Sequence, residues 1–195
     1  MSNATQSLAG TRITSLLDAN SFVEIGQGVT ARSTDFNMTA NKAPSDGVIT
    51  GYGVIDDKLV YVYSQDASVL NGTVGEMHAK KITRLYDLAM KTGAPVIGLV
   101  DCAGIRLQEA TDALEAFGQI YLKQTLASGV IPQITAIFGT CGGGMAVIPS
   151  HEQISHSWNP KKGKKCSSHT KCTGRKQHRQ MRHQQQLISR AKRQV

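Results

Sequence analysis

The sequence predicts an α/β fold, with helices packed on a largely parallel sheet, over residues 11–150. Two observations predict it. Runs rich in β-branched and aromatic residues alternate with amphipathic stretches of helical period. Two of the runs, 94–100 and 131–138, are almost continuously apolar, as is typical of parallel strands covered on both faces. This order of strands and helices calls for right-handed crossovers between parallel neighbours.

The chain opens with residues 1–10, which are small and polar, and we expect a frayed N-terminus there. Residues 11–25 follow. They carry Ile13, Leu16 and Leu17 at helical spacing and end in a run that favours extended structure.

A loop and a hairpin come next. Residues 26–47 contain many Thr, Asn, Asp and Ser with little periodicity, which predicts a surface loop. Strands are expected at 48–55 and 58–65, because both runs are rich in β-branched and aromatic residues and flank the turn-like pair Asp56-Asp57.

Two helices are predicted beyond the hairpin. Thr73 and Glu76 have the spacing of a capping box, which predicts a helix start. The apolar face of that helix comprises Ile82, Leu85 and Ala89, and Gly93 is expected to end it. The second helix is predicted over 112–127.

Two loops stand where ligands bind in α/β folds, at the carboxyl ends of strands. The first is 101–109 and the second is 139–146, which contains three consecutive glycines, Gly142 to Gly144. Glycines before a helix leave backbone N–H groups able to hold a negative oxygen. The second loop lacks the lysine of a P-loop and the spacing of a dinucleotide fingerprint. Close packing of a helix on its neighbour explains the glycines equally well.

Composition divides the chain near Ser150. The 195 residues are 40% hydrophobic and only 18% charged, which excludes an unstructured chain as a whole. Residues 1–150 hold ten Lys and Arg against thirteen Asp and Glu, whereas residues 151–195 hold twelve against one. The net charge of +8 therefore comes from the tail. No apolar run reaches the roughly 20 residues that span a bilayer, so we expect a cytoplasmic protein.

Four segments in this order resemble the amino-terminal half of the biotin-dependent acyl-CoA carboxyltransferases. They are Gly75-Glu-Met-His-Ala-Lys-Lys-Ile82, Gly93-Ala-Pro-Val-Ile-Gly-Leu-Val-Asp101, Ala103-Gly-Ile-Arg-Leu-Gln-Glu109 and Gly139-Thr-Cys-Gly-Gly-Gly144. The family includes the β subunits of acetyl-CoA and propionyl-CoA carboxylases and related decarboxylase subunits. The resemblance implies a crotonase-like spiral of ββα units, here incomplete, because the family's chain continues with a second domain.

The resemblance also implies a reaction. Such enzymes transfer a carboxyl group from carboxybiotin to the α-carbon of an acyl-CoA such as acetyl-CoA or propionyl-CoA, through an enolate that backbone amides stabilise. By motif, one donor falls at Ala103 or Gly104, and the other at Gly143, with Gly142 or Gly144 as alternatives. No side-chain base is required.

Contacts with CoA are expected at basic residues near these motifs. Arg106 either meets a CoA phosphate or orients its loop through an ion pair with Glu109 or Asp101. Lys80 and Lys81 either contact phosphate or form a solvated helix face. His78 is expected to be structural, and Cys102 and Cys141 to be small packing residues.

The tail, 151–195, is expected to be a basic segment of low order, and three interpretations of it stay open. A genuine basic extension would attract nucleic acid. A zinc site from Cys166, Cys172, His178 and His183 fits no common finger spacing, so no metal is predicted. A slipped reading frame is the interpretation we favour, because another frame yields Thr-Asp-Phe-Thr-Phe-Met-Glu from codons 152–159, as the family pattern leads us to expect.

The resemblance implies partners that the sequence itself does not show. They are a biotin carboxyl carrier, a biotin carboxylase subunit, the acyl-CoA substrate and further copies of the full-length chain, because the family builds its site between two subunits. Without the second half, we expect the fragment to be inactive alone. Fatty acid biosynthesis is one context for such an enzyme. The alternatives are a biotin-dependent acyl-CoA or malonate decarboxylase subunit, a basic nucleic-acid-binding protein and a non-catalytic scaffold.

Overall fold

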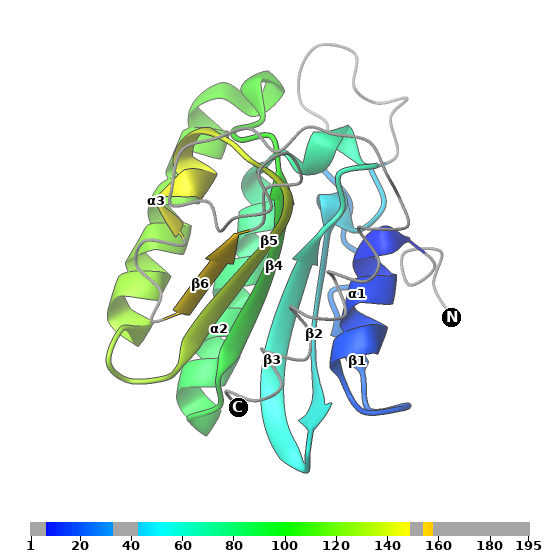
Figure 1. The fold of residues 1–195 in the computed structure, drawn as a ribbon. Coiled ribbons are helices and arrows are strands. Elements are labelled where there is room, and N and C mark those ends of the chain that lie inside the picture. The colour runs from blue at the N-terminus through cyan, green and yellow to red at the C-terminus, as the bar shows by residue number, and fades with distance from the viewer. Residues whose placement is uncertain (1–6, 33–42, 149–153, 158–195) are drawn as a thin grey trace.

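A single twisted sheet organises the molecule. The computed structural model describes residues 7–32, 43–148 and 154–157, and within them six strands pair in the order β1-β2-β3-β4-β5-β6 (Figure 1). The strand bounds are Val23–Ile25, Val48–Ile55, Lys58–Gln65, Val96–Cys102, Gln133–Cys141 and Ile154–Ser157. Strands β1 to β3 are antiparallel, whereas β3 to β6 are parallel. The carboxyl ends of β4 and β5 therefore lie side by side.

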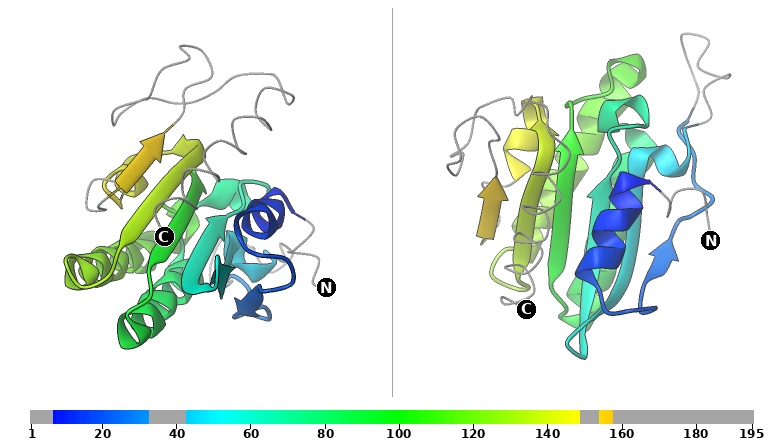
Figure 2. Two further views of the ribbon diagram at one scale, coloured as in Figure 1. Left: turned by 60° about the horizontal axis from the view of Figure 1, so that its bottom comes forward. Right: turned by 45° about the vertical axis from the view of Figure 1, so that its right-hand side comes forward.

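Helices cover both faces of this sheet. The longer helices α2 (Glu76–Thr92) and α3 (Ala110–Ala127) pack on one face, and α1 (Leu8–Leu16) packs on the other against β2 and β3 (Figures 1 and 2). Side chains of a strand alternate between these two layers. In β3, Tyr61 and Tyr63 face α2, while Val60 and Val62 face α1.

The first helix begins earlier than the sequence indicated. The Ser7 hydroxyl accepts a hydrogen bond from the Gly10 amide at 3.3 Å and caps α1, which starts at Leu8. The expectation of a frayed segment 1–10 is thus wrong for its last three residues, because a small polar residue is also a good N-cap. Residues 1–6 lie outside the described part.

The start of α2 corrects a second expectation. Gly75 is the N-cap of this helix, and the Thr73 hydroxyl donates to the Leu70 carbonyl instead of capping it. The carboxylate that accepts from the Glu76 amide, at 2.6 Å, comes from Glu109 beyond β4. A tertiary contact thus replaces the local capping box.

The end of α2 agrees with the sequence. Gly93 adopts a left-handed φ of 70° and its amide donates to the Ala89 carbonyl, as expected of a glycine that terminates a helix. The hairpin of β2 and β3 also has the predicted bounds.

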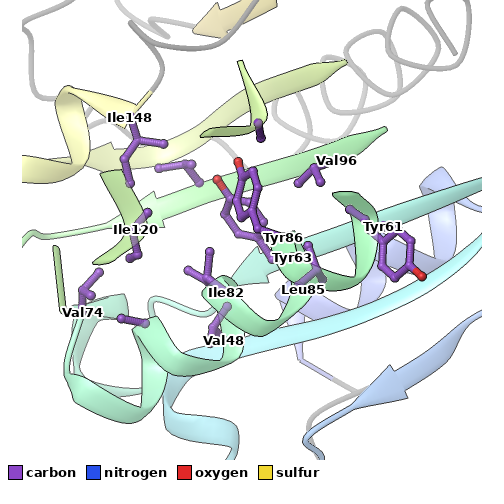
Figure 3. Packing of buried hydrophobic residues seen from close by; sticks show 14 of the residues in the cluster. Val48, Tyr61, Tyr63, Val74, Ile82, Leu85, Tyr86, Val96, Ile120 and Ile148 are labelled. Atoms are coloured by element: carbon purple, nitrogen blue, oxygen red, sulfur yellow. The ribbon is translucent and has the colours of Figure 1, made fainter. Parts of the chain in front are cut away.

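The main core lies between the sheet and the helices α2 and α3. Figure 3 shows Ile82, Leu85 and Tyr86 of α2 directed toward the same region as Tyr63 of β3 and Ile120 of α3, and all five are buried. Strands β4 and β5 contribute side chains to this core and lead directly into the two glycine-containing loops.

A short strand occurs in the tail. Residues Ile154–Ser157 pair in parallel with Ile134 to Ile137 of β5, which differs from the expectation of no regular structure after Ser150. Backbone hydrogen bonds to an available sheet edge require no hydrophobic period, so sequence pattern does not reveal them. The remaining residues from 158 onward, including the four candidate zinc ligands, lie outside the described residues.

The close fit between β3 and β4 gives a first test. A Cβ at Gly98 would lie 2.3 Å from the Tyr63 hydroxyl oxygen, in a fully buried layer. We expect Gly98→Ala to lower the free energy of unfolding by about 1–3 kcal/mol. Gly118→Ala is the control, because a Cβ at this α3 position meets nothing within 4 Å. It should raise stability by about 0.5–1 kcal/mol. Urea unfolding of both variants measures the two changes, and equal effects would contradict this packing.

Candidate active site

The loops that follow β4 and β5 touch through their backbones. The Gly142 amide donates to the Cys102 carbonyl at 3.0 Å. Cys102 of β4 lies opposite Cys141 of β5 in the strand register, and no disulfide joins these two residues. A Cβ at Gly142 would lie only 2.5 Å from the Ala103 carbonyl oxygen. Glycine is therefore required at 142 for the two loops to approach so closely.

The second loop turns at Gly143. This residue has a φ of 56° and begins the 3₁₀ turn η6 (Gly143–Ala146), whose first hydrogen bond joins the Met145 amide to the Gly142 carbonyl. The amides of Gly143 and Gly144 precede that bond, and the first N–H groups of a helix have no acceptor within it. A Cβ at Gly143 would meet nothing within 4 Å, so the turn borders open space.

Packing explains the third glycine. A Cβ at Gly144 would lie 2.6 Å from the Tyr121 hydroxyl and 3.0 Å from the Phe117 ring, both on α3. The Tyr121 hydroxyl also donates to the Gly144 carbonyl at 2.6 Å. Helix α3 thus holds η6 in place, as the packing explanation of the glycines anticipated for this position.

The first loop supplies two candidate amides that differ in their bonding. The Ala103 amide donates to the Asn71 carbonyl at 3.1 Å. The Gly104 amide lies 3.3 Å from the Cys102 sulfur, which is a weak acceptor. Gly104 has a φ of 125°, and a Cβ there would lie 3.3 Å from the Gly142 carbonyl oxygen and 3.9 Å from the Gly143 nitrogen.

These contacts divide the five expected oxyanion donors into amides that already donate to a backbone carbonyl and amides that do not. The amides of Ala103 and Gly142 already donate to backbone carbonyls. Those of Gly104, Gly143 and Gly144 have weak acceptors or stand at a helix start, and they lie on turns that adjoin each other. Such an arrangement suits a carbonyl oxygen that gains negative charge.

Arg106 is part of a buried charge cluster. It is 1% exposed, and its guanidinium pairs with Asp46 and, at 2.8 Å, with Glu109. It also donates to the Thr73 carbonyl at 2.8 Å. The expected ion pair with Glu109 is present, and the alternative contact with a CoA phosphate is excluded by this burial.

Lys81 is likewise buried, which corrects both expectations for it. Its amine donates to the carbonyls of Ser45 and Val48. Burial lowers the pKa of Lys81 to about 8, although the negative charges of Glu24 and Asp46 act to raise it. It therefore neither lies on a solvated helix face nor reaches a phosphate.

Lys80 remains exposed on α2. Its amine pairs with Glu76 at 2.6 Å, one helical turn earlier. Lys80 and Glu76 line a groove of about 360 Å³ between α2 and α3 together with Arg32, which pairs with Glu76 and Asp112. The salt bridge on this exposed side chain contributes little stability.

His78 is fully buried and structural. Its Nδ1 lies 2.8 Å from the Asp46 carbonyl and its Nε2 lies 3.1 Å from the Gln65 side-chain nitrogen. A carbonyl only accepts, so Nδ1 carries the proton and Nε2 accepts from Gln65. Burial, together with the charge of Arg106, lowers the pKa of His78 to about 3.

The two cysteines pack beside the glycine turns, as expected. Cys102 is buried, and burial raises the pKa of its thiol to about 12, so it is not a nucleophile near neutral pH. The Cys141 thiol donates to the Met145 carbonyl at 3.3 Å and secures η6.

Sequence reasoning missed three residues that hold these loops. Asp46 lies in a turn treated as surface loop, yet it is fully buried and burial raises its pKa. Gln65 ends β3 on the core-facing side, and Tyr121 lies on α3. The only sequence signal for these residues was Gln65 itself, a polar residue on the core-facing side of a strand end. Its partners His78 and Met145 are 13 and 80 residues away in sequence, so local pattern does not reveal them.

The described part of the chain holds a cavity besides the α2–α3 groove. This second cavity, of about 120 Å³, is lined by Ser7, Pro44, Ser45, Gly47, Val48, Ile49, Asp66, Ser68 and Val69. Neither this cavity nor the α2–α3 groove borders Gly104 or Gly143. Within residues 7–32 and 43–148, no three His, Cys, Asp or Glu side chains are grouped as metal ligands. Among the described helices, none is both long and apolar enough to cross a membrane.

Comparison with known proteins identifies the family. The model of the carboxyl transferase domain matches residues 3–155, more than half of the chain. The chain belongs to the carboxyl transferase family. The alpha subunit of methylmalonyl-CoA decarboxylase from Veillonella parvula is 50% identical over 139 residues. The propionyl-CoA carboxylase beta chain of Roseobacter denitrificans is 49% identical over 139 residues. Each match covers 71% of this chain and 27% of the relative, so the chain spans about a quarter of these proteins.

Solved structures of carboxyl transferases agree. The transcarboxylase 12S structure with hydrolysed methylmalonyl-coenzyme A bound superposes with a TM-score of 0.74 at 35% identity, covering 78% of this chain and 32% of that one. The crotonase-like α/β fold implied by the resemblance is confirmed, and so is membership of an enzyme family that includes carboxylases and decarboxylases of CoA thioesters.

Burial of His78 predicts a specific loss of stability in acid. Its folded pKa of about 3 lies below the unfolded value of 6.5, so the unfolded chain takes up a proton first as pH falls. Stability should fall from pH 6.5 downward by about 1.4 kcal/mol per pH unit until the folded pKa is reached. The difference in unfolding free energy between wild type and His78→Gln, measured from pH 8 to 5, isolates this proton. Parallel curves for the two proteins would show that His78 is not buried in the neutral form.

Proposed function

We propose that this chain forms the acyl-CoA side of a carboxyltransferase site, where the amides of Gly104 and Gly143 hold the thioester oxygen and Gly144 is a further donor. The observation that carries the proposal is the approach of the two turns, with a Cβ position at Gly104 only 3.9 Å from the Gly143 nitrogen. Family membership supports it, because the match includes both turns.

The proposed chemistry is stabilisation of an enolate oxygen by backbone amides, which do not titrate near neutral pH. Transfer of the α-proton of an acyl thioester to a base, which bound biotin would supply in this family, produces an enolate whose oxygen becomes negative as the transition state forms. Preorganised N–H groups stabilise that oxygen without reorganising, and losing one donor costs about 3 kcal/mol. The neutral, buried His78 and the high pKa of Cys102 make neither side chain a base or nucleophile for this step.

Propionyl-CoA and methylmalonyl-CoA are the substrates that the relatives' names favour over acetyl-CoA. The alternative direction is decarboxylation by the same enolate. Identities of 50% to a decarboxylase subunit and 49% to a carboxylase chain do not separate the two directions. Both directions use the same two turns.

Biotin enters this proposal only through the family. When bound to a carrier, carboxybiotin supplies the carboxyl group, and further copies and carrier subunits complete such a site. We assign none of the described residues to biotin. We further propose that a slipped reading frame produces the tail, since the family match ends at residue 155, close to the change in composition.

Ligand comparison tests the proposed oxygen site. We expect the 195-residue chain to bind propionyl-CoA about tenfold more tightly than the propyl thioether of CoA, which lacks the carbonyl oxygen. Two neutral hydrogen bonds of about 0.7 kcal/mol each account for this ratio. Isothermal titration calorimetry measures both dissociation constants. Equal affinities, or no saturable binding of either ligand, would refute the oxygen site.

A matched pair of glycine variants tests the turn itself. Gly143 and Gly129 both have positive φ, 56° and 76°, and a Cβ at either meets nothing within 4 Å. Alanine at either position should therefore cost about 1 kcal/mol of stability. Only Gly143→Ala should also reduce the preference for the thioester, by about threefold or more, because it tilts the donor amide. The same preference in Gly143→Ala as in Gly129→Ala would argue against Gly143 as a donor.

A further inference from the structure

We infer that the carboxylate of Asp101 is the positioning group that sets the distance between the two oxyanion turns, with Arg12 of α1 as its counter-ion. The inference rests on the proposed function of these turns and adds residues to it. Asp101 does not touch the thioester in this proposal. It acts through the backbone of the neighbouring loop.

The two oxygens of Asp101 have different partners. Oδ1 accepts from the Thr140 amide at 3.1 Å, and Oδ2 accepts from the Arg12 guanidinium at 2.8 Å. Asp101 stands three residues before Gly104, and Thr140 stands three residues before Gly143. The carboxylate thus joins the two loops at equal distance along the chain from the two proposed donors.

The surroundings leave Asp101 little freedom. Its amide donates to the Gln65 side-chain oxygen at 3.3 Å. A Cβ at Gly139 would lie 2.0 Å from Oδ1, and a Cβ at Gly72 would lie 2.3 Å from the Asp101 carbonyl oxygen. Glycines at 72 and 139 make room for the backbone and side chain of Asp101, so its place is specified from both sides.

Arg12 supports the carboxylate from the opposite layer of the fold. It is 6% exposed, donates to the Gln65 carbonyl at 3.3 Å and stacks its guanidinium 4.9 Å from the centre of the Phe138 ring. The ion pair is largely shielded from water, with the Arg12 and Asp101 side chains 7% and 14% exposed, and removing either partner leaves a poorly solvated charge, which is unfavourable. Helix α1, remote in sequence, thereby contributes to the geometry of both loops.

The test uses Asp101→Asn, which keeps the shape of the side chain but gives Arg12 no anionic partner. Arg12→Gln removes the same ion pair from the other side. Asp87→Asn is the control, because Asp87 pairs with Lys123 at 2.6 Å between α2 and α3, away from both loops. All three are made in the 195-residue chain.

The first measurement is amide hydrogen exchange, which needs no ligand. We expect exchange of the amides from Thr140 to Gly142, which include the Thr140 amide bonded to Asp101 and the Gly142 amide bonded to Cys102, to accelerate about tenfold or more in Asp101→Asn and in Arg12→Gln, relative to the rest of β4 and β5. Asp87→Asn should leave this segment unchanged. Unchanged exchange in either ion-pair variant, or uniform acceleration over the whole sheet, would overturn the inference.

The second measurement is the ratio of affinities for propionyl-CoA and its propyl thioether analogue. We expect the ratio to fall to about threefold or less in both ion-pair variants while affinity for the thioether stays constant, since only the oxygen contact depends on the spacing. A wild-type chain that shows no preference refutes the proposed function, yet exchange still decides the role of Asp101. If the wild-type chain prefers propionyl-CoA and the two ion-pair variants keep the same affinity ratio, the positioning role of Asp101 is overturned.

Discussion

Close contact between two backbones, at the ends of β4 and β5, is the constraint on which the rest of the site depends. The Gly142 amide reaches the Cys102 carbonyl, and no Cβ fits between Gly142 and Ala103. Parallel strands of the same sheet bring these loops to one edge, but glycine lets them touch. Two turns that adjoin each other can then present N–H groups to one oxygen, which is the property that enolate chemistry requires.

A cluster of buried charged side chains anchors the 101–109 loop. Arg106 joins Asp46 to Glu109, and Glu109 in turn accepts from the first amide of α2. Burying an ion pair costs desolvation, which is offset only when each partner is fully bonded. The cluster ties the 101–109 loop to the turn at Asp46 through Arg106. Arg106 is thereby engaged inside the protein, although the family resemblance alone left a contact with CoA open for it.

Sequence periodicity predicted the bounds of helices and strands better than it predicted their tertiary hydrogen bonds. The bounds of β2 and β3 and the end of α2 at Gly93 agree with the sequence, because alternation and a left-handed glycine are local properties. The capping box at Thr73 failed because a carboxylate from 33 residues away competes for the same amide. Burial of Lys81 was missed for a similar reason, since two carbonyls of another segment accept from its amine.

By itself, the sequence determined the α/β class, the family and the two glycine loops, because hydrophobic period and motif order are written along the chain. Only the tertiary structure decided which amides remain able to donate. Ala103 and Gly142 look equivalent to Gly104 and Gly143 in the sequence, yet their N–H groups are bonded to Asn71 and Cys102. Hydrogen bonding depends on what lies beside each amide in space, and no pattern of neighbouring residues specifies that.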